Sequence, residues 1–406
     1  MDRSAGEVRL RIESLGKGGD SVGRAEDGRV VFADGGVPGD LVLVELVEQK
    51  ARWARGVVRE IIEVGKERVP APCEYQARCG GCPWQVAAMP TQLAAKQQIV
   101  ERALRNLGVE VEPIVASPQT LGYRGRATLS VRHGKLGFFG RRSHEVVEIE
   151  RCIALEPALD RALARASDGL SRELGEEGVL RGTSAAQGIH LAFEPGRGAD
   201  LAALLARARR LVDEGIVGML VDGRAVGAAL LDAGDFLVSA AGFRQANAAQ
   251  NDVLRRLVAQ WLEPAGRTVL ELYCGDGNFT RDLSSAAGVV AVEEDAAAFS
   301  RLRKNVPSAT AVNARVERDV EQRARRGERH ERVLLDPPRA GAKDAVQFIA
   351  ALSPDRIVYV SCDVATLARD LAAFRALGYR TTRAVPVDLM PHTDHVEVVA
   401  LLERAP

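Results

Sequence analysis

"IVYVSCDVATLARD", Ile357 to Asp370, joins a short apolar run to a segment with helical spacing. The run Ile357–Val360 predicts a buried parallel strand, and Thr366–Leu377 predicts a helix, so Ser361 and Cys362 fall at the C-terminal end of the strand. In open α/β sheets, binding sites form at that edge. A cysteine there is a candidate nucleophile if its surroundings favour the thiolate; the alternative on these residues alone is a buried, inert thiol.

A regular strand-helix alternation surrounds this stretch from about Asp235 to the C-terminus. A helix is predicted over Ala248–Leu262, and another segment with helical spacing is Phe299–Asn305. Four further apolar runs predict strands: Thr268–Leu272, Val289–Val292, Ala309–Val312 and Val333–Leu335. The order predicts a Rossmann-like α/β domain with a doubly wound parallel sheet.

The first predicted turn of this domain is glycine-rich, with the sequence "ELYCGDGNFT" at Glu271–Thr280. Gly275 and Gly277 allow a tight turn and close approach of a ligand, but Thr280 stands where a dinucleotide fingerprint has its third glycine. Glu293 ends the next predicted strand, where a carboxylate can bond ribose hydroxyls. The pattern indicates a nucleoside ligand without a pyrophosphate, as S-adenosylmethionine is.

Two carboxylates occupy unusual places in the remaining predicted strands. Asp336 ends an apolar run and precedes two prolines that stiffen the loop "DPPRAG". Glu397 lies within the otherwise apolar run Val396–Leu402. A helix cap and an edge-strand surface residue are the structural alternatives. The functional interpretation is a pre-positioned carboxylate at Asp336 and a proton acceptor at Glu397.

The N-terminal residues 1–66 read as a separate all-β module. Short alternating runs, Val8–Ile12, Val30–Ala33, Leu41–Val47 and Gly56–Ile62, are separated by glycine-rich turns. They predict an OB-like barrel. With "SLGKGGDSVGR" and "VFADGGVPGD", the module resembles a TRAM domain, an RNA-binding barrel. We therefore expect three domains, over 1–66, 67–234 and 235–406.

The middle segment carries closely spaced cysteines. Cys73, Cys79 and Cys82 lie in "CEYQARCGGCPWQ", and Cys152 follows far downstream. In a long chain without a secretory signal, this spacing favours a soft-metal site over disulfides, and four thiolates suit either zinc or an iron-sulfur cluster. A helix is predicted after Pro90 over 91–107.

Composition bounds the setting of the protein. The 406 residues are 46% hydrophobic, carry no net charge and include no apolar run near 20 residues, so we expect no membrane anchor and a cytoplasmic location. Zero net charge neither requires nor excludes nucleic acid. The segment Tyr123–Arg151 is locally basic with interleaved aromatic residues, which suits an RNA surface or a solvated β face.

Five phrases in this order, "FRQAN", "LYCGDGNF", "LLDPPRAG", "VYVSCDVATLARDL" and "MPHTDHVEVVALLER", resemble the RNA 5-methyluridine methyltransferases, and the barrel and cysteines resemble their 23S rRNA branch. The resemblance implies Cys362 as nucleophile and Glu397 as base. It implies a 4Fe-4S cluster on Cys73, Cys79, Cys82 and Cys152. It implies that six residues line the pocket for S-adenosylmethionine and uracil: Gln245, Tyr273, Asn278, Glu293, Asn313 and Asp336.

The chain departs from the family pattern at three positions. Asp363 and Val364 replace an Asn-Pro pair, and Met390 replaces a phenylalanine. Loss of the proline predicts a looser loop, and a carboxylate beside Cys362 disfavours its thiolate. The leading hypothesis is a monomeric 23S rRNA uracil-C5 methyltransferase. The alternatives are a tRNA substrate, a catalytically silent RNA-binding or ribosome-assembly protein, and a cytosine-C5 methyltransferase.

Overall fold

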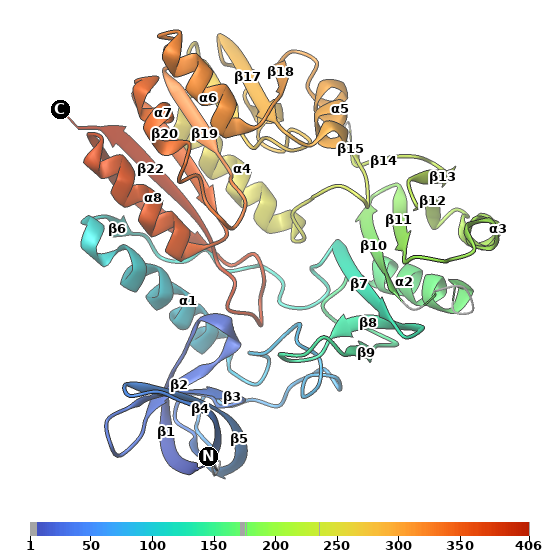
Figure 1. The fold of residues 1–406 in the computed structure, drawn as a ribbon, viewed down its shortest axis with the longest axis vertical. Coiled ribbons are helices and arrows are strands. Elements are labelled where there is room, and N and C mark those ends of the chain that lie inside the picture. Colours follow the sequence, from blue (N-terminus) through green and yellow to red (C-terminus); the bar gives the residue numbers. More distant parts are fainter. Residues whose placement is uncertain (1–5, 171–174, 176, 235, 406) are drawn as a thin grey trace. The chain divides into compact units, whose positions relative to one another are not determined.

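A computed structural model describes residues 6–170, 175, 177–234 and 236–405 (Figure 1). The expected domain boundary at Asp235 lies outside the described residues. The chain divides into two units. The N-terminal unit comprises the described residues up to Ile99 together with Phe139–His144 and Met390–His395, and the main unit comprises the rest.

Five strands of the N-terminal unit form a closed barrel in the order β1-β2-β3-β5-β4. Their bounds are β1 Glu7–Leu15, β2 Ser21–Arg24, β3 Val30–Asp34, β4 Leu41–Gln49 and β5 Trp53–Glu63. Alternate residues point inward, and Ile12, Val31 and Val42 are among the buried side chains of the core. A 3-10 turn, Lys17–Gly19, joins β1 to β2. The predicted barrel is thus confirmed.

The predicted helix after the cysteines is also present. Helix α1 spans Met89–Leu104, and a 3-10 turn, Arg105–Leu107, continues it. Gly108 ends the element in the left-handed conformation, with φ 69°. The helix begins two residues earlier than predicted because Pro90 fits a first helical turn, where its missing N–H costs nothing.

The first sheet of the main unit has seven strands in the order β13-β12-β11-β10-β7-β8-β9. The strands are β7 Arg126–Arg132, β8 Lys135–Phe139, β9 Val146–Glu148, β10 Glu177–Ala185, β11 Gly188–Pro195, β12 Ile216–Val221 and β13 Arg224–Gly227. Helices α2, Pro157–Leu170, and α3, Leu201–Leu211, bury leucines against this sheet. A small hairpin follows, β14 Leu231–Asp232 and β15 Leu237–Val238.

The second sheet has eight strands in the order β18-β17-β16-β19-β20-β22-β21-β6. They are β6 Glu110–Val111, β16 Thr268–Leu272, β17 Gly288–Glu293, β18 Thr310–Asn313, β19 Arg332–Leu335, β20 Arg356–Ser361, β21 Tyr379–Val387 and β22 Glu397–Arg404. The strands from β18 to β20 pair in parallel, whereas β22 is antiparallel to β20 and β21. All five predicted parallel strands are confirmed.

Helices α4 to α8 lie along this sheet in Figure 1. Their bounds are α4 Ala248–Leu262, α5 Ala296–Asn305, α6 Val316–Arg325, α7 Val346–Ala351 and α8 Val364–Ala376. Helix α4 matches its prediction at both ends, because Asn247 caps its first turn by accepting a hydrogen bond from the Gln250 N–H. Helix α8 starts two residues before the predicted segment, for the reason given below.

Candidate active site

Three candidate residues meet at one edge of the second sheet. Asp336 follows β19 and Cys362 follows β20, and these strands run in parallel. Strand β22 runs the other way beside β20, with Ser361 opposite Val398, so it begins at the same edge with Glu397. The register of three neighbouring strands therefore brings together a thiol and two carboxylates from distant positions in the sequence.

The three groups act on one another electrostatically. Burial, together with the charges of Glu397 and Asp336, raises the pKa of the Cys362 thiol to about 11. Burial also raises the pKa of Glu397 to about 8 and that of Asp336 to about 7, and Asp336 contributes to the rise at Glu397. In this arrangement the carboxyl groups hold protons near neutral pH, and the thiol is largely unionised.

One cation opposes these effects. Arg339, three residues after Asp336 in the same loop, lowers the pKa of both Cys362 and Glu397. A cation that favours the thiolate is what a nucleophilic cysteine requires. Sequence reasoning did not select Arg339 as a site residue, although it stands in the quoted loop "DPPRAG".

The departure at Asp363 has a structural role that its position beside Cys362 does not reveal. Its side chain caps α8 by accepting hydrogen bonds from the N–H groups of Ala365 and Thr366, each 3.0 Å long. Its backbone N–H donates to the Ser361 hydroxyl (3.2 Å), and its carbonyl accepts from the same hydroxyl (3.1 Å). Asp363 thus begins the helix, and its expected effect on the Cys362 thiolate stays a prediction.

A buried carboxylate holds the loop after Asp336 in place. Asp370 of α8 is 1% exposed and accepts hydrogen bonds from the Tyr359 hydroxyl (2.8 Å) and the Ala342 N–H (2.7 Å). Gly341 precedes Ala342 with φ 76°, and a Cβ atom there would lie 2.5 Å from the Asp370 Oδ2. Glycine at this position thus permits close contact between the loop and α8.

The glycine-rich turn after β16 lies along the same edge, next to the strands just described. Gly275 has φ 57°, and no atom lies within 4 Å of where its Cβ would be, so the turn faces open space. Its N–H donates to the Glu293 Oε2 (2.8 Å), and the other carboxylate oxygen accepts from the Asp295 N–H (2.7 Å). Glu293 is therefore held beside the turn, where the sequence predicted it.

The other predicted pocket residues occupy the ends of neighbouring strands or the segment before α4. Tyr273 has a left-handed backbone, φ 60°, and its hydroxyl donates to Glu317 (3.1 Å). Asn278 exchanges two 2.9 Å hydrogen bonds with Asn251 of α4. Asn313 ends β18 and donates to the Glu293 carbonyl (2.8 Å), and Gln245 is half-buried just before α4.

Matches to known proteins cover almost the whole chain. The family model described as tRNA (Uracil-5-)-methyltransferase matches residues 236–405, and the TRAM domain model matches residues 6–58. The 23S rRNA (uracil(1939)-C(5))-methyltransferase RlmD of Edwardsiella ictaluri is 34% identical over 94% of this chain and 92% of its own length. The chain belongs to the RNA uracil-C5 methyltransferase family. This confirms the resemblance carried by the sequence motifs.

Two further comparisons agree with this assignment. An RNA methyltransferase of Gloeobacter violaceus is 33% identical over 98% of the chain and 96% of its own length. The crystal structure of the Pyrococcus abyssi tRNA (uracil-54, C5)-methyltransferase in complex with S-adenosyl-L-homocysteine superimposes with a TM-score of 0.73 and 25% identity, covering 97% of this chain and 100% of that one. The fold of this RNA uracil-C5 methyltransferase is thus that of its family.

The predicted cluster cysteines belong to two different units of this methyltransferase. Cys73, Cys79 and Cys82 are half-buried in the N-terminal unit, and the Gly81 N–H donates to the Cys79 Sγ (3.4 Å). Among the described residues, which include all four cysteines, no group of three or more His, Cys, Asp or Glu side chains is arranged to hold a metal ion. The 4Fe-4S cluster on these four cysteines therefore stays a prediction.

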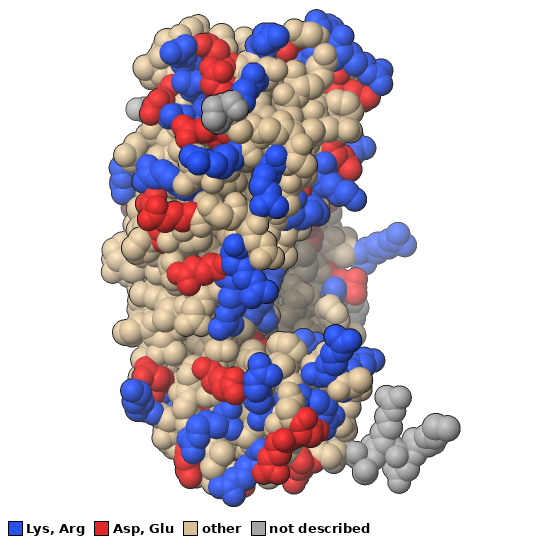
Figure 2. Space-filling view, turned by 90° about the vertical axis from the view of Figure 1, so that its left-hand side faces the viewer, with Lys and Arg blue, Asp and Glu red and all other residues tan. Residues whose placement is uncertain are grey.

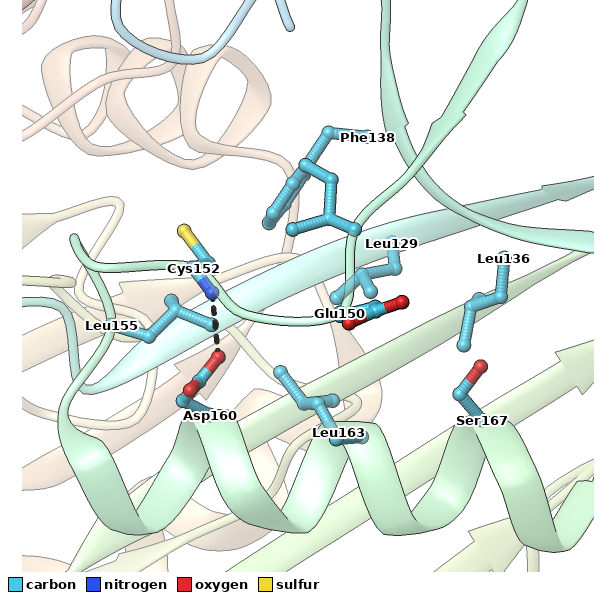
Figure 3. Close-up of a pocket in the computed structure, with 11 residues that line it drawn as sticks. Leu129, Leu136, Phe138, Glu150, Cys152, Leu155, Asp160, Leu163 and Ser167 are labelled. Carbon is cyan, nitrogen blue, oxygen red and sulfur yellow. Dashed lines mark hydrogen bonds between the residues drawn. The ribbon is translucent and has the colours of Figure 1, made fainter. Parts of the chain in front are cut away.

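Cys152 belongs to the main unit of the methyltransferase. It lines a largely apolar pocket between α2 and the first sheet, with its sulfur drawn beside Leu155 and Phe138 (Figure 3). Its backbone N–H donates to Asp160 (2.7 Å).

Within the ranges that the structure describes, no helix is both long and apolar enough to cross a membrane.

Sequence reasoning missed one buried carboxylate of the methyltransferase domain. Glu271 in β16 is 1% exposed, and neither of its carboxylate oxygens has a hydrogen-bond partner of good geometry among the described residues. Burial raises its pKa to about 8. The signal was available, because Glu271 interrupts an apolar strand just as Glu397 does.

Proposed function

We propose that this enzyme methylates C5 of a uridine in 23S rRNA with S-adenosylmethionine, using Cys362 as nucleophile and Glu397 as base. The observation that carries the proposal is the meeting of Cys362, Glu397 and Asp336 at the sheet edge that also presents the glycine-rich turn. A thiol and a buried carboxyl group at one site are the two groups that substitution at uracil C5 requires.

The residues at the glycine-rich turn fit the methyl donor. The open space at Gly275 leaves room for a ligand against the backbone, and Glu293 is fixed beside it by two backbone N–H groups. This is the edge at which open α/β sheets bind nucleosides. S-adenosylmethionine, when bound, supplies an electrophilic methyl group and leaves as S-adenosylhomocysteine.

Cys362 supplies the nucleophile that uracil itself lacks. Its thiolate adds to C6, so that an S–C6 bond forms and the electron pair of the C5=C6 bond becomes available at C5 for the methyl group. The thiol must first lose its proton, which its high pKa opposes and Arg339 favours. Asp336, at the same edge, is placed to bind the uracil ring as it enters unstacked from the RNA.

Glu397 completes the reaction. Its carboxylate takes the proton from C5, the electrons of that C–H bond restore the C5=C6 bond, and the S–C6 bond breaks to return the thiolate. The pKa of about 8 makes this carboxylate a stronger base than an ordinary glutamate while leaving a useful fraction ionised near neutral pH. Gln245, Tyr273, Asn278 and Asn313 complete the proposed pocket.

The choice of 23S rRNA is supported by the similar proteins. Several RlmD proteins, 23S rRNA (uracil(1939)-C(5))-methyltransferases, are 30–35% identical over 94–98% of the chain. The tRNA enzyme of Pyrococcus abyssi is 25% identical, so tRNA is the second candidate. Figure 2 shows basic and acidic side chains interspersed over the face that it displays. The TRAM barrel offers an RNA-binding surface outside the methyltransferase domain.

The predicted domains belong to the same proposal: a barrel over 1–66, a central RNA-contacting domain over 67–234, and a methyltransferase domain over 235–406. The strand order, which runs from β16 outward in both directions, supports the doubly wound arrangement. The RNA is its expected partner, and the enzyme is expected to act as a monomer.

The test is methyl transfer from labelled S-adenosylmethionine to unmodified 23S rRNA and tRNA in parallel, followed by nucleoside mass spectrometry. We expect 5-methyluridine in the 23S rRNA, and none with the Cys362→Ala variant. Product in tRNA alone reassigns the substrate. Product from the alanine variant removes Cys362 as nucleophile, and 5-methylcytidine overturns the reaction. No methylation of either RNA favours a silent RNA-binding protein.

A further inference from the structure

A short segment just before Glu397 packs within the N-terminal unit. Strand β21 ends at Val387 and β22 begins at Glu397, so residues 388–396 form the connection. Its middle, Met390–His395, belongs to the N-terminal unit, although the strands on either side belong to the main unit. The base proposed for the reaction is thus covalently joined, two residues further on, to a segment that another unit holds.

Gln92 of α1 holds the centre of this segment. Its Oε1 accepts a hydrogen bond from the His392 N–H (2.9 Å), and its Nε2 lies 3.2 Å from the His392 Nδ1. The same Nε2 donates to the carbonyls of Trp84 (3.0 Å) and Ala87 (2.8 Å), which fixes the side chain. The Trp84 N–H donates in turn to the His392 carbonyl (3.0 Å). Gln92 is 1% exposed and His392 is 6% exposed, so these bonds are shielded from water.

Two further contacts hold the ends of the segment. The fully buried Lys96 of α1 donates to the Met390 carbonyl (2.9 Å), and the Gly18 N–H in the turn between β1 and β2 donates to the Asp394 Oδ2 (2.8 Å). The segment is also bonded within itself, because the Thr393 hydroxyl donates to the Met390 carbonyl (2.7 Å). The TRAM-like barrel and α1 therefore both contribute to its anchorage.

From these contacts we propose that Gln92, Lys96 and Asp394 are positioning residues for the proton-abstraction step, because they hold the chain that leads into Glu397. The proposal rests on the proposed function. On its other side Glu397 is held by the sheet, where it pairs with Val387 of β21. Release of the segment would leave Glu397 held by its strand pairing alone. A displacement of about 1 Å at a reacting group can cost on the order of 100-fold in rate.

The reaction order makes this role distinguishable from a general structural one. Cys362 addition and methyl transfer precede proton abstraction, so a displaced Glu397 leaves the RNA attached to Cys362 as a methylated adduct. A variant that merely loosens the fold or weakens RNA binding forms less adduct and less product together. The amount of adduct relative to product therefore reports on the position of the base.

The experiment uses the full chain, 23S rRNA and S-adenosylmethionine with a labelled methyl group. The variants are Gln92→Ala, Lys96→Met and Asp394→Ala. Asp394→Asn serves as the conservative variant, since its amide oxygen can still accept from the Gly18 N–H. Ser21→Ala is the matched control, because it removes a buried hydrogen bond (Ser21 hydroxyl to Ala33 carbonyl, 2.8 Å) of the same unit without touching the segment. Covalent adduct is measured on denaturing gels, and turnover and KM for RNA are measured alongside.

We expect turnover to fall by roughly 10- to 100-fold in the alanine and methionine variants, with little change in KM and a several-fold rise in adduct. Asp394→Asn and Ser21→Ala should behave as the wild type does. Loss of adduct in step with product, a rise confined to KM, or an equal effect of Ser21→Ala overturns the proposal. If the wild-type protein forms neither adduct nor 5-methyluridine, the proposed function fails and the positioning proposal fails with it. If the wild-type protein is active but the variants do not accumulate adduct, only the positioning proposal fails.

Discussion

Replacement of Glu397 by glutamine should make Cys362 a more reactive thiol while it abolishes turnover. Burial, with the charges of Glu397 and Asp336, raises the pKa of Cys362 to about 11, so at pH 8 only about one thiol in 10³ is ionised. An opposite or like charge at close range shifts a pKa by about 1–3 units. Removing the charge of Glu397 should lower the pKa of Cys362 by about one unit and raise the thiolate fraction about tenfold.

The effect should depend on pH in a direction set by Glu397 itself. Its pKa is about 8, so below pH 7 the wild-type side chain is protonated and glutamine removes no charge. The two proteins should then be alkylated at similar rates at pH 6.5, and the variant should react about tenfold faster near pH 9. Iodoacetamide labelling of the Cys362 peptide, followed by mass spectrometry, measures these rates, and the buried Cys274 provides an unreactive internal reference.

Turnover provides the second half of this test. The variant lacks a base, so 5-methyluridine formation should fall by about 10² or more even though the nucleophile is more reactive. Equal alkylation rates across the whole pH range would show that the two groups are not coupled as the structure indicates. Retention of full activity by the variant would remove Glu397 as base.

Three other predictions follow from the structure. Gly341→Ala should destabilise the protein by about 1–3 kcal/mol in urea unfolding and reduce activity, because its Cβ would lie 2.5 Å from Asp370. Gly378→Ala, with φ 87° but no atom nearby, controls for backbone strain. An equal loss of stability in both variants would contradict the steric argument. Glu271 has a folded pKa of about 8 against an ordinary 4.5, so its protonated form contributes stability that is complete below pH 4.5 and lost as pH rises to 8. Glu271→Gln should therefore gain about 3–4 kcal/mol relative to wild type between pH 5 and pH 8, and parallel stability curves would refute this. Iron and sulfide analysis with visible absorption of anaerobically purified protein tests the cluster expected from the resemblance: a brown chromophore supports it, and stoichiometric zinc or no metal rejects it.

Local sequence patterns were enough to predict the barrel, the parallel strands of the second sheet and helices α1, α4 and α8. Period-two alternation in the barrel, apolar runs for the parallel strands and the spacing of Ala248–Leu262 all report on burial, which the chain encodes residue by residue. The same patterns placed Cys362 and Asp336 at strand ends, and the sheet topology then required those ends to share an edge.

Only the tertiary structure decided how these residues affect one another. The pKa values of Cys362 and Glu397 and the opposing charge of Arg339 depend on distances between groups from different strands and loops. The contact between Gln92 and His392 joins positions 300 residues apart, and no local pattern reports such a pairing. Periodicity records which side chains are buried, whereas the electrostatics and the anchorage of the site depend on which buried groups become neighbours.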